Sequence, residues 1–227
     1  MQGILSVVFL LNITMQRPIT PVKIEGIILA AGLSTRMGVP KLTVEIEGIP
    51  IIRRVVRAAL ESELHRVILV IGPSDSGSVE ALGPVAADPR LSQVVNPCPQ
   101  EGMSSSMRTG MESLDSEAAG VMILLGDQPG ITGDIINKLL AAFRREQTKI
   151  VVPLVLGRRT TPVIFPATLF PELMEESGDI GGRNVLKRHT DQVVELEMGQ
   201  DYDDTDLDTP EDVARAAGAS RDGRRIQ

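Results

Sequence analysis

The stretch VKIEGIILAAGLSTRMGVPK, residues 22–41, joins an apolar run to a loop rich in small, hydroxyl-bearing and basic residues. Ile27, Ile28 and Leu29 indicate a buried strand that enters a tight turn. Exposed amides, hydroxyls and cations at the carboxyl end of a strand suit an anion, above all a polyphosphate. The loop matches neither G-x-G-x-x-G nor G-x-x-x-x-G-K-S/T, so an ordinary structural turn is an equal alternative on spacing alone.

Further along the chain, apolar runs alternate with segments of helical periodicity. Strands are expected at 24–29, 66–72, 92–97 and 120–126, and helices at 49–63, 77–83, 103–114 and 132–146. Thr132 is the expected N-cap of the last of these helices. Strands that alternate with helices predict an α/β fold whose mostly parallel sheet is covered by helices on both faces.

The second part of the chain has a different character. KIVVPLVLGRRTTPVIF, residues 149–165, predicts two strands around a Gly-Arg-Arg-Thr turn. It is followed by ATLFPELMEE as a helix, SGDIGGR as a glycine-rich loop, NVLKRH as a helix, QVVELEM as a strand and DTPEDVARAA as a final helix. No internal repeat or linker interrupts the pattern, so a single domain is the simplest organisation.

Composition excludes several classes of function. Aromatic residues make up 2% of the chain and Trp is absent, which argues against the base-stacking surfaces of single-strand nucleic-acid binders. A formal net charge of −7 disfavours broad binding to nucleic acid or to an anionic membrane. Cys98 is the single cysteine, which fits a reducing cytoplasm and leaves no disulfide framework. The apolar run at residues 4–13 is too short to span a bilayer.

Acidic residues supply a candidate metal site. The strand VMILLG is followed by Asp-Gln-Pro, which puts Asp127 at the same edge of the sheet as the Gly32 loop. A carboxylate there can ligate Mg²⁺ while a phosphate supplies further oxygens. The alternative is a turn or N-cap aspartate. Asp206, in the acidic run at 201–212, is the candidate second ligand, because it has no obvious structural role, whereas Asp208 or Thr209 could cap the final helix.

The segment NPCPQEGMSSSM, residues 96–107, supplies a third candidate element. Asn96 ends a strand, Gly102 breaks the loop, and Ser104 and Ser105 stand where a helix begins. The start of a helix offers free amides and a positive dipole end, and hydroxyls there can hydrogen-bond a base or a ribose. Ordinary N-capping by Ser104 is the alternative, and it explains one serine rather than the set.

Five motifs together resemble the molybdopterin nucleotidyltransferase-like family, most nearly its molybdenum cofactor cytidylyltransferase branch. They are LAAGLSTRMGVPK, NPCPQEGMSSSMRTG, LLGDQP, SGDIGGRNVL and DTPED, in that order. The resemblance covers about Val22 to Ala217 and implies a Rossmann-like three-layer α/β sandwich of the nucleotide-diphospho-sugar transferase type. It implies a single nucleotidyltransferase domain at 22–217. The polar, charged residues 218–227 are expected to form a tail. Residues 1–21 are expected to be an extension: an over-called start, a disordered segment or an appended strand.

The resemblance also implies a reaction and roles for individual residues. A phosphate of molybdopterin would attack the α-phosphorus of a nucleotide, with Mg²⁺ bound and pyrophosphate released. The catalytic residues implied are Arg36, Lys41 and Asp127, and the metal ligands are Asp127 and Asp206, with Asp208 as alternate. The nucleotide-binding residues implied are Leu29, Ala30, Ala31, Gly32, Ser34, Gly38, Asn96, Gly102, Ser104 and Ser105. Such chemistry needs positioning and charge neutralisation more than a protein nucleophile.

The resemblance says less about which nucleotide and which acceptor the protein uses. LAAG, in place of the LAGG common in the guanylyl branch, favours CTP as the nucleotide. Thr160-Thr161-Pro162 stands where cytidylyl-type members often carry Gly-His-Pro, which puts the molybdopterin acceptor in question. The alternatives are a sugar-1-phosphate nucleotidyltransferase, a molybdopterin guanylyltransferase and, from another class, a non-catalytic nucleotide-binding maturation protein. A molybdoenzyme is a further expected partner, whereas nucleic acid and membrane are not.

Overall fold

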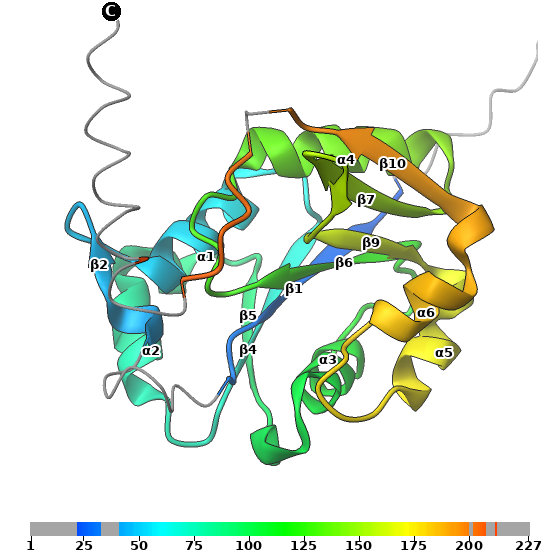
Figure 1. The fold of residues 1–227 in the computed structure, drawn as a ribbon. Helices are drawn as coiled ribbons and strands as arrows, with labels where there is room; N and C mark the ends of the chain where they lie inside the picture. Colours follow the sequence, from blue (N-terminus) through cyan, green and yellow to red (C-terminus); the bar gives the residue numbers. More distant parts are fainter. Residues whose placement is uncertain (1–21, 33–40, 200–201, 208–211, 213–227) are drawn as a thin grey trace, which may run out of the picture.

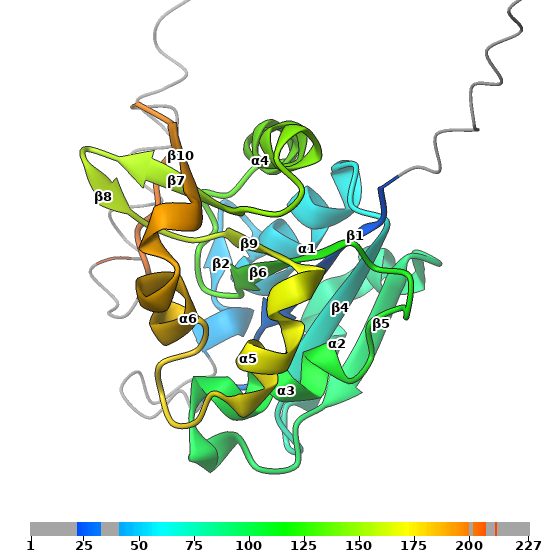
Figure 2. The same cartoon turned by 90° about the vertical axis from the view of Figure 1, so that its right-hand side faces the viewer.

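The computed structural model describes residues 22–32, 41–199, 202–207 and 212. In this part of the chain an eight-stranded sheet has the order β10-β7-β9-β6-β1-β4-β5, with β8 paired to β7 (Figures 1 and 2). Its strands are β1 (Ile24–Leu29), β4 (Arg66–Ile71), β5 (Leu91–Val95), β6 (Gly120–Leu125), β7 (Ile150–Val155), β8 (Arg158–Arg159), β9 (Val163–Pro166) and β10 (Val193–Glu197). A two-stranded sheet pairs β2 (Glu45–Ile46) with β3 (Ile49–Pro50).

Six α-helices accompany these strands in the described residues. They are α1 (Ile51–Glu61), α2 (Ser76–Leu82), α3 (Met103–Met111), α4 (Gly133–Arg145), α5 (Phe170–Glu175) and α6 (Arg183–Arg188). Short 3-10 turns are η1 (Lys41–Thr43), η2 (Gly83–Ala87), η3 (Pro99–Glu101), η4 (Ala167–Leu169) and η5 (Thr190–Gln192). Thr132 caps α4 as predicted, because its hydroxyl oxygen accepts a hydrogen bond from the Ile135 amide.

The centre of the sheet is parallel. Ile27 of β1 pairs with Ile68 of β4 on one side and with Ile123 of β6 on the other. Every residue of β1 is buried, as expected of a central strand flanked on both sides and covered on both faces. β9 runs antiparallel to both β6 and β7, so β7 and β10 point the same way as β1. The carboxyl ends of β1 and β6 therefore meet at one edge.

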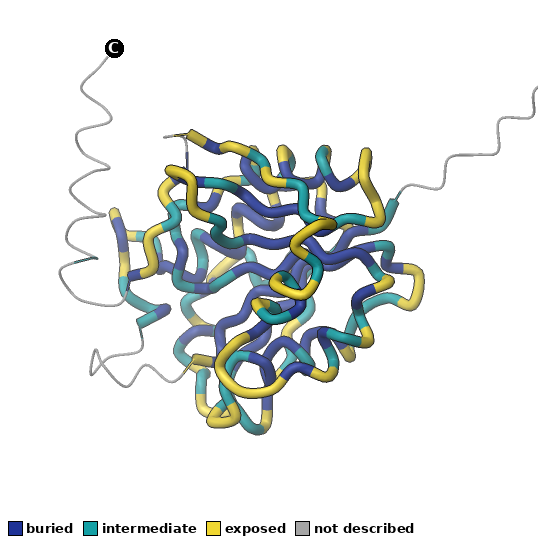
Figure 3. The backbone as a smooth tube through the Cα atoms, turned by 45° about the vertical axis from the view of Figure 1, so that its right-hand side comes forward, coloured by how far each residue is buried: buried dark blue, intermediate teal, exposed yellow. Residues whose placement is uncertain are grey.

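The structure has three layers, a sheet between two layers of helices, and a hydrophobic core lies on each face of the sheet. Alternate residues of β1 point to opposite faces, so Ile28 joins one core and Ile27 the other. The first core lies under α1, α2 and α4, and the second lies under α3, α5 and α6 (Figures 1 and 2). Buried backbone fills the middle of the molecule and exposed loops surround it (Figure 3). The predicted α/β sandwich with a mostly parallel sheet is confirmed.

The predicted turn Gly-Arg-Arg-Thr is wrong by about two residues. Arg158 and Arg159 form β8, which pairs with the end of β7, and the turn between these strands consists of Leu156 and Gly157. Both turn residues have positive φ, 49° and 76°. Such a pair gives the twist that a two-residue hairpin needs, and glycine is the residue that adopts it without strain.

The helix predicted at 49–63 starts later. Ile49 and Pro50 belong to β3, which pairs with β2 across a turn with positive φ at Glu47 and Gly48. The final helix predicted at 208–217 lies almost wholly outside the described residues, as do the segments 1–21 and 218–227. Among the helices that the structure describes, none has both the length and the apolar character needed to cross a membrane.

Candidate functional site

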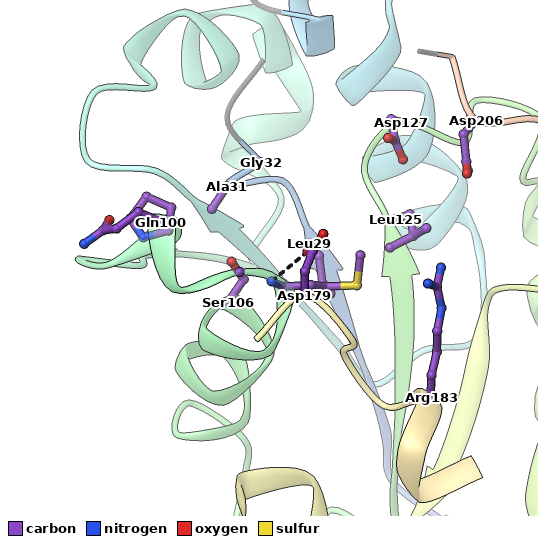
Figure 4. A pocket seen from close by; sticks show the side chains of 13 residues that line it. Leu29, Ala31, Gly32, Gln100, Ser106, Leu125, Asp127, Asp179, Arg183 and Asp206 are labelled. Carbon is purple, nitrogen blue, oxygen red and sulfur yellow. Dashed lines mark hydrogen bonds between the residues drawn. The ribbon is translucent and has the colours of Figure 1, made fainter. Parts of the chain in front are cut away.

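A pocket of about 520 Å³ opens at the edge where β1 and β6 end (Figure 4). Its walls come from five segments that are distant in sequence. The first segment is the end of β1 and the loop after it, with Leu29, Ala31 and Gly32, and the second runs from η3 into α3, with Gln100, Gly102, Met103 and Ser106. The third is the end of β6 and the turn after it, with Leu125 and Asp127. The fourth is the loop before α6 and its first residue, with Asp179 and Arg183, and the fifth contains Asp206, near the end of the described chain. The loop after β1 and the Asp-Gln-Pro turn therefore share one cavity, as predicted for strands that are parallel neighbours.

The first residues of the loop after β1 are held by backbone hydrogen bonds. The Ala30 amide donates to the Val70 carbonyl, and the Gly126 amide donates to the Leu29 carbonyl, both at 2.9 Å. Ala30 is buried in the core under α1 and does not line the pocket, whereas its neighbours Ala31 and Gly32 do. The other predicted residues of this loop, Ser34, Arg36 and Gly38, lie outside the described residues.

Lys41 and Asp127 meet although they are far apart in sequence. Lys41 Nζ lies 2.8 Å from Asp127 Oδ2, and the two side chains are 12% and 28% exposed. A charge-assisted hydrogen bond of this length is one of the stronger polar contacts in a protein. The sequence interpretation gave the two residues separate partners, triphosphate and metal, and the structure brings them into direct contact.

Asp206 lies in the same pocket as Asp127, and Gln128 holds it there. Gln128 Nε2 donates to Asp206 Oδ1 at 2.8 Å, and Gln128 Oε1 accepts from Thr161 Oγ1 at 2.6 Å. Because a carboxylate only accepts, these partners determine the orientation of the amide. The Gln128 side chain is 4% exposed. The Leu207 amide also donates to the Asp127 carbonyl at 3.3 Å, so the segment that carries Asp206 is tied to the loop after β6.

The two predicted metal ligands are thus brought together, and they are chemically suited to the ion. Carboxylate oxygens are the donors that Mg²⁺ and Mn²⁺ prefer, and Mg²⁺ commonly takes one or two from the protein and the rest from phosphate and water. Within the described residues, no cluster of three or more His, Cys, Asp or Glu side chains could hold a metal. A metal at Asp127 and Asp206 would take its remaining oxygens from bound phosphate and water. Asp208, the alternate, lies outside the described residues.

Asn96 and Ser105 shape the loop beside the pocket. Asn96 is 1% exposed, and its Nδ2 donates to Ser105 Oγ at 2.8 Å and to Ser106 Oγ at 3.0 Å. Its Oδ1 accepts from the Cys98 amide at 2.9 Å. Ser105 Oγ in turn lies 2.8 Å from the carbonyl oxygen of Gly102. These contacts close the turn between β5 and α3, and Ser106 is the serine that lines the pocket.

Ser104 is not the cap of α3. The N-cap position belongs to Gly102, which makes no side-chain cap, so that alternative is wrong. Ser104 is fully buried, its amide donates to the Gly178 carbonyl at 3.0 Å, and its hydroxyl has no hydrogen-bond partner among the described residues. Its predicted contact with a base or ribose stays a prediction, as does that of Ser105.

The glycine-rich loop between α5 and α6 packs against the start of α3. Gly102 has a φ of 91°, and a Cβ there would lie 2.6 Å from the Gly178 carbonyl carbon. The Met103 amide donates to Asp179 Oδ1 at 3.2 Å. This close approach brings Asp179 and Arg183 into the pocket wall.

Sequence reasoning missed several of these residues. Gln100, Ser106, Gln128, Asp179 and Arg183 were not among the candidates, although all five lie in motifs quoted for the resemblance. Gln100 and Ser106 lie in NPCPQEGMSSSMRTG, Gln128 lies in LLGDQP, and Asp179 and Arg183 lie in SGDIGGRNVL. The signal was therefore present, but it did not indicate which side chains face the cavity.

Tyr202, four residues before Asp206, anchors this segment of the chain near the pocket. Its hydroxyl donates to the Thr161 carbonyl at 2.7 Å, and the residue is 2% exposed. Burial raises the pKa of the Tyr202 phenol, and the nearby carboxylates of Asp204 and Asp206 add to this shift. The phenol is therefore neutral near neutral pH and serves as a hydrogen-bond donor.

Known proteins resemble this chain in sequence and in fold. Over 202 residues it is 35% identical to the purine catabolism protein PucB of Bacillus subtilis (strain 168). The alignment covers 85% of this chain and 96% of PucB. The crystal structure of Rv0371c from Mycobacterium tuberculosis H37Rv is 26% identical with a TM-score of 0.75, over 88% of this chain and 100% of that one. A structure of Rv0371c in complex with manganese is 24% identical with a TM-score of 0.71, over 87% and 99%.

A family model covers most of the domain. Residues 26–193 match the MobA-like NTP transferase domain, a span that includes the loop after β1, Asp127 and the glycine-rich loop before α6. The chain belongs to the MobA-like NTP transferase domain family and is a nucleotidyltransferase of that family.

Proposed function

We propose that this nucleotidyltransferase transfers CMP from CTP to the phosphate of a molybdopterin-type acceptor, with Mg²⁺ as its metal. A bond forms between an acceptor phosphate oxygen and the α-phosphorus of CTP, and the bond from that phosphorus to the oxygen bridging to the β-phosphate breaks, releasing pyrophosphate. The observation that carries the proposal is a single pocket that contains the Ala31–Gly32 loop, Asp127 and Asp206, with Lys41 bound to Asp127.

The proposal gives each of these groups a task. Ala31 and Gly32, with little or no side chain, let the backbone approach the triphosphate closely. Lys41 would turn from Asp127 toward the departing pyrophosphate when both nucleotide and metal are bound, since each ion then has a new partner of opposite charge. Arg36, Ser34 and Gly38 keep their predicted places in the triphosphate cradle.

Asp127 and Asp206 are the proposed metal ligands. A divalent cation held there would offset charge on the phosphates at which the displacement occurs. The manganese complex of Rv0371c supports a divalent metal at a site of this fold, and the hard oxygen donors of the two aspartates suit Mg²⁺ equally. Gln128 would orient Asp206 toward the metal through the Nε2 hydrogen bond described above.

The base and the acceptor rest on the resemblance. LAAG at Leu29–Gly32 favours CTP, and Ala31 lines the pocket at the position where the guanylyl branch has glycine. Thr161 replaces the histidine of related cytidylyl enzymes, and its hydroxyl is occupied by Gln128. A sugar 1-phosphate acceptor, GTP as donor and a non-catalytic role in cofactor maturation are the competing proposals. A cytoplasmic location and a molybdoenzyme as the recipient of the product complete the favoured one.

The test is pyrophosphate release from each of the four common ribonucleoside triphosphates. Each reaction contains purified protein and either Mg²⁺, Mn²⁺ or EDTA, with molybdopterin, with a sugar 1-phosphate or with no acceptor. We expect release only with CTP, a divalent metal and molybdopterin. An Asp127→Asn variant, which keeps the shape of the side chain, is the control for contaminating activity.

Each alternative has its own signature in this panel. GTP as the preferred donor would identify a guanylyltransferase, and turnover with the sugar phosphate alone would identify a sugar-1-phosphate enzyme. Tight Mg²⁺-dependent CTP binding without release from any acceptor would favour the maturation role. Turnover that persists in EDTA would contradict the metal mechanism.

A further inference from the structure

The pocket contains a cation that the proposed nucleotide chemistry does not use. Arg183 is the first residue of α6 and lines the cavity together with Asp127 and Asp206. Figure 4 shows its side chain extending from α6 toward the wall that carries these two carboxylates. It is exposed, and its guanidinium forms no hydrogen bond or ion pair with the other described residues.

We propose that Arg183 is the binding subsite for the phosphate group of the acceptor. The inference rests on the proposed function, because transfer to a phosphate requires a second anion beside the nucleotide. Two anionic reactants repel each other, so the wall opposite the nucleotide needs a fixed positive charge. Lys41 is assigned above to the departing pyrophosphate, and Arg183 is the one cation among the described residues that line the pocket. A guanidinium presents a planar fork of donors that matches two phosphate oxygens.

The local fold holds Arg183 in place. Two hydrogen bonds fix the loop before it to α3: the Ser104 amide donates to the Gly178 carbonyl, and the Met103 amide donates to Asp179 Oδ1. Gly182 lies against the Phe165 ring, where a Cβ would come within 2.7 Å of a ring carbon. Asp179 also lines the pocket, and its Oδ1 accepts from the Met103 amide; it forms no ion pair with Arg183 among the described residues.

The acceptor chemistry follows from this arrangement. The subsite would take a terminal phosphate monoester, which molybdopterin and sugar 1-phosphates both carry. It does not by itself choose between these acceptors, because the guanidinium would contact only the phosphate group they share. Acceptor identity must come from other parts of the pocket wall.

The experiment measures inorganic phosphate binding by calorimetry. The protein is first saturated with Mg²⁺ and the non-hydrolysable analogue α,β-methylene-CTP, so that the triphosphate positions are filled. Three variants are compared with the wild type: Arg183→Gln, Arg183→Lys and Lys187→Gln. Lys187 is the matched control, because it is an exposed cation on the same helix that does not line the pocket.

We expect wild type and Lys187→Gln to bind phosphate with affinities that agree within about twofold. Arg183→Gln should weaken binding by about tenfold or more, and Arg183→Lys should fall between the two because it keeps the charge but loses the fork. Affinity for the CTP analogue should stay within about twofold in all variants. With an acceptor that turns over, Arg183→Gln should raise KM for that acceptor and leave KM for CTP unchanged.

Several results would overturn the inference. They are no phosphate binding by the wild type, equal weakening by Lys187→Gln, or an Arg183→Gln variant that loses CTP-analogue affinity to the same degree. In each case the proposed function could still hold, since Mg²⁺-dependent CTP binding is measured first. Absence of that binding in the wild type would instead contradict the proposed function.

Discussion

The side-chain amide of Gln128 connects two other segments of the chain at the edge of this pocket. It is almost fully buried, it donates to Asp206, and it accepts from Thr161. Its two partners come from segments that follow β8 and β10, so one side chain links three parts of the chain that are remote in sequence. Where a side chain orients a metal ligand, its replacement commonly lowers metal affinity or activity by about 10–100-fold.

Replacement of Gln128 by Leu should therefore weaken metal binding. Asp206 would lose its donor and Thr161 its acceptor, with an expected loss of stability of about 1–3 kcal/mol. Affinity for Mn²⁺ in the presence of CTP should fall about 10–100-fold, measured by electron paramagnetic resonance of the free ion. Thr161→Val keeps the bond to Asp206 and should have a much smaller effect on the metal. Unchanged Mn²⁺ affinity in a destabilised Gln128→Leu variant would show that this residue only supports the fold.

Asp127 and Asp206 should behave as a unit if they share one metal. Asp127→Asn and Asp206→Asn should each reduce turnover by about 10²-fold or more, because the charge stabilisation supplied by a metal is worth several kcal/mol of barrier. The double variant should be little worse than either single one, as expected of groups that act together. Steady-state kinetics with circular dichroism as a folding control would measure this.

Two comparisons make the aspartate test decisive. Asp191→Asn, an exposed aspartate away from the pocket, removes the same charge and should leave turnover unchanged. Full activity in Asp206→Asn beside an inactive Asp208→Asn would show that Asp208 is the second ligand. Full activity in Asp127→Asn would contradict the mechanism.

At the scale of elements, polar contacts join α5 to the end of α6, the helix that begins at Arg183. Glu172 of α5 accepts from His189 Nε2 at 2.8 Å, and Arg188 of α6 reaches both Glu172 and the buried Glu176. The hydrogen bond from the His189 ring, with a smaller contribution from Arg188, holds the pKa of the Glu172 carboxyl below its usual value of 4.5. The ionised carboxylate is thus the form that the folded state favours.

This shift predicts a loss of stability in acid. A carboxyl whose pKa is lower in the folded state stabilises the fold above its unfolded pKa, and the contribution is lost as pH falls through the folded value. Glu172→Gln should therefore lower the melting temperature at pH 7, and the difference from wild type should shrink as pH falls below about 4.5. Thermal melts at several pH values test this. Glu80→Gln, an exposed control on α2, should show a small difference throughout, and a constant gap for Glu172→Gln would contradict the prediction.

At the scale of the whole molecule, the pocket is a product of the sheet. Two hydrophobic cores hold the central strands rigid, and five segments reach one edge of that frame. The polar contacts of the site, such as Lys41 with Asp127, then form between residues that share no local sequence. A ligand that contacts several of these segments should stabilise the entire fold and not one loop.

Binding of CTP with Mg²⁺ should accordingly raise the melting temperature. A ligand at about 100 times its Kd adds about 2.7 kcal/mol to the free energy of unfolding. CTP with EDTA should give a smaller shift, since Asp127 and Asp206 would then face the phosphates without a cation between them. Differential scanning fluorimetry with CTP, GTP and no nucleotide checks this. Equal shifts with and without metal would contradict a metal-bridged site, and a larger shift with GTP would overturn the choice of base.

Local pattern was enough to predict the layers of this fold. Apolar runs of the right length gave β1, β4 and β6, the hydroxyl of Thr132 marked the start of α4, and their alternation predicted a parallel sheet. The position of Asp127 at the edge of the pocket followed too, because parallel strands end on the same side. Each of these inferences depends on residues that are near one another in the chain.

Contacts between distant segments were decided only when the sheet was assembled. The pairing of Lys41 with Asp127, the link from Thr161 through Gln128 to Asp206, and the placement of Arg183 each join parts of the chain with no common periodicity. The rotation of α3 likewise determines that Ser106 and not Ser104 lines the cavity. Side-chain spacing along one segment says which face of that segment is apolar, but it does not say which other segment meets the polar face.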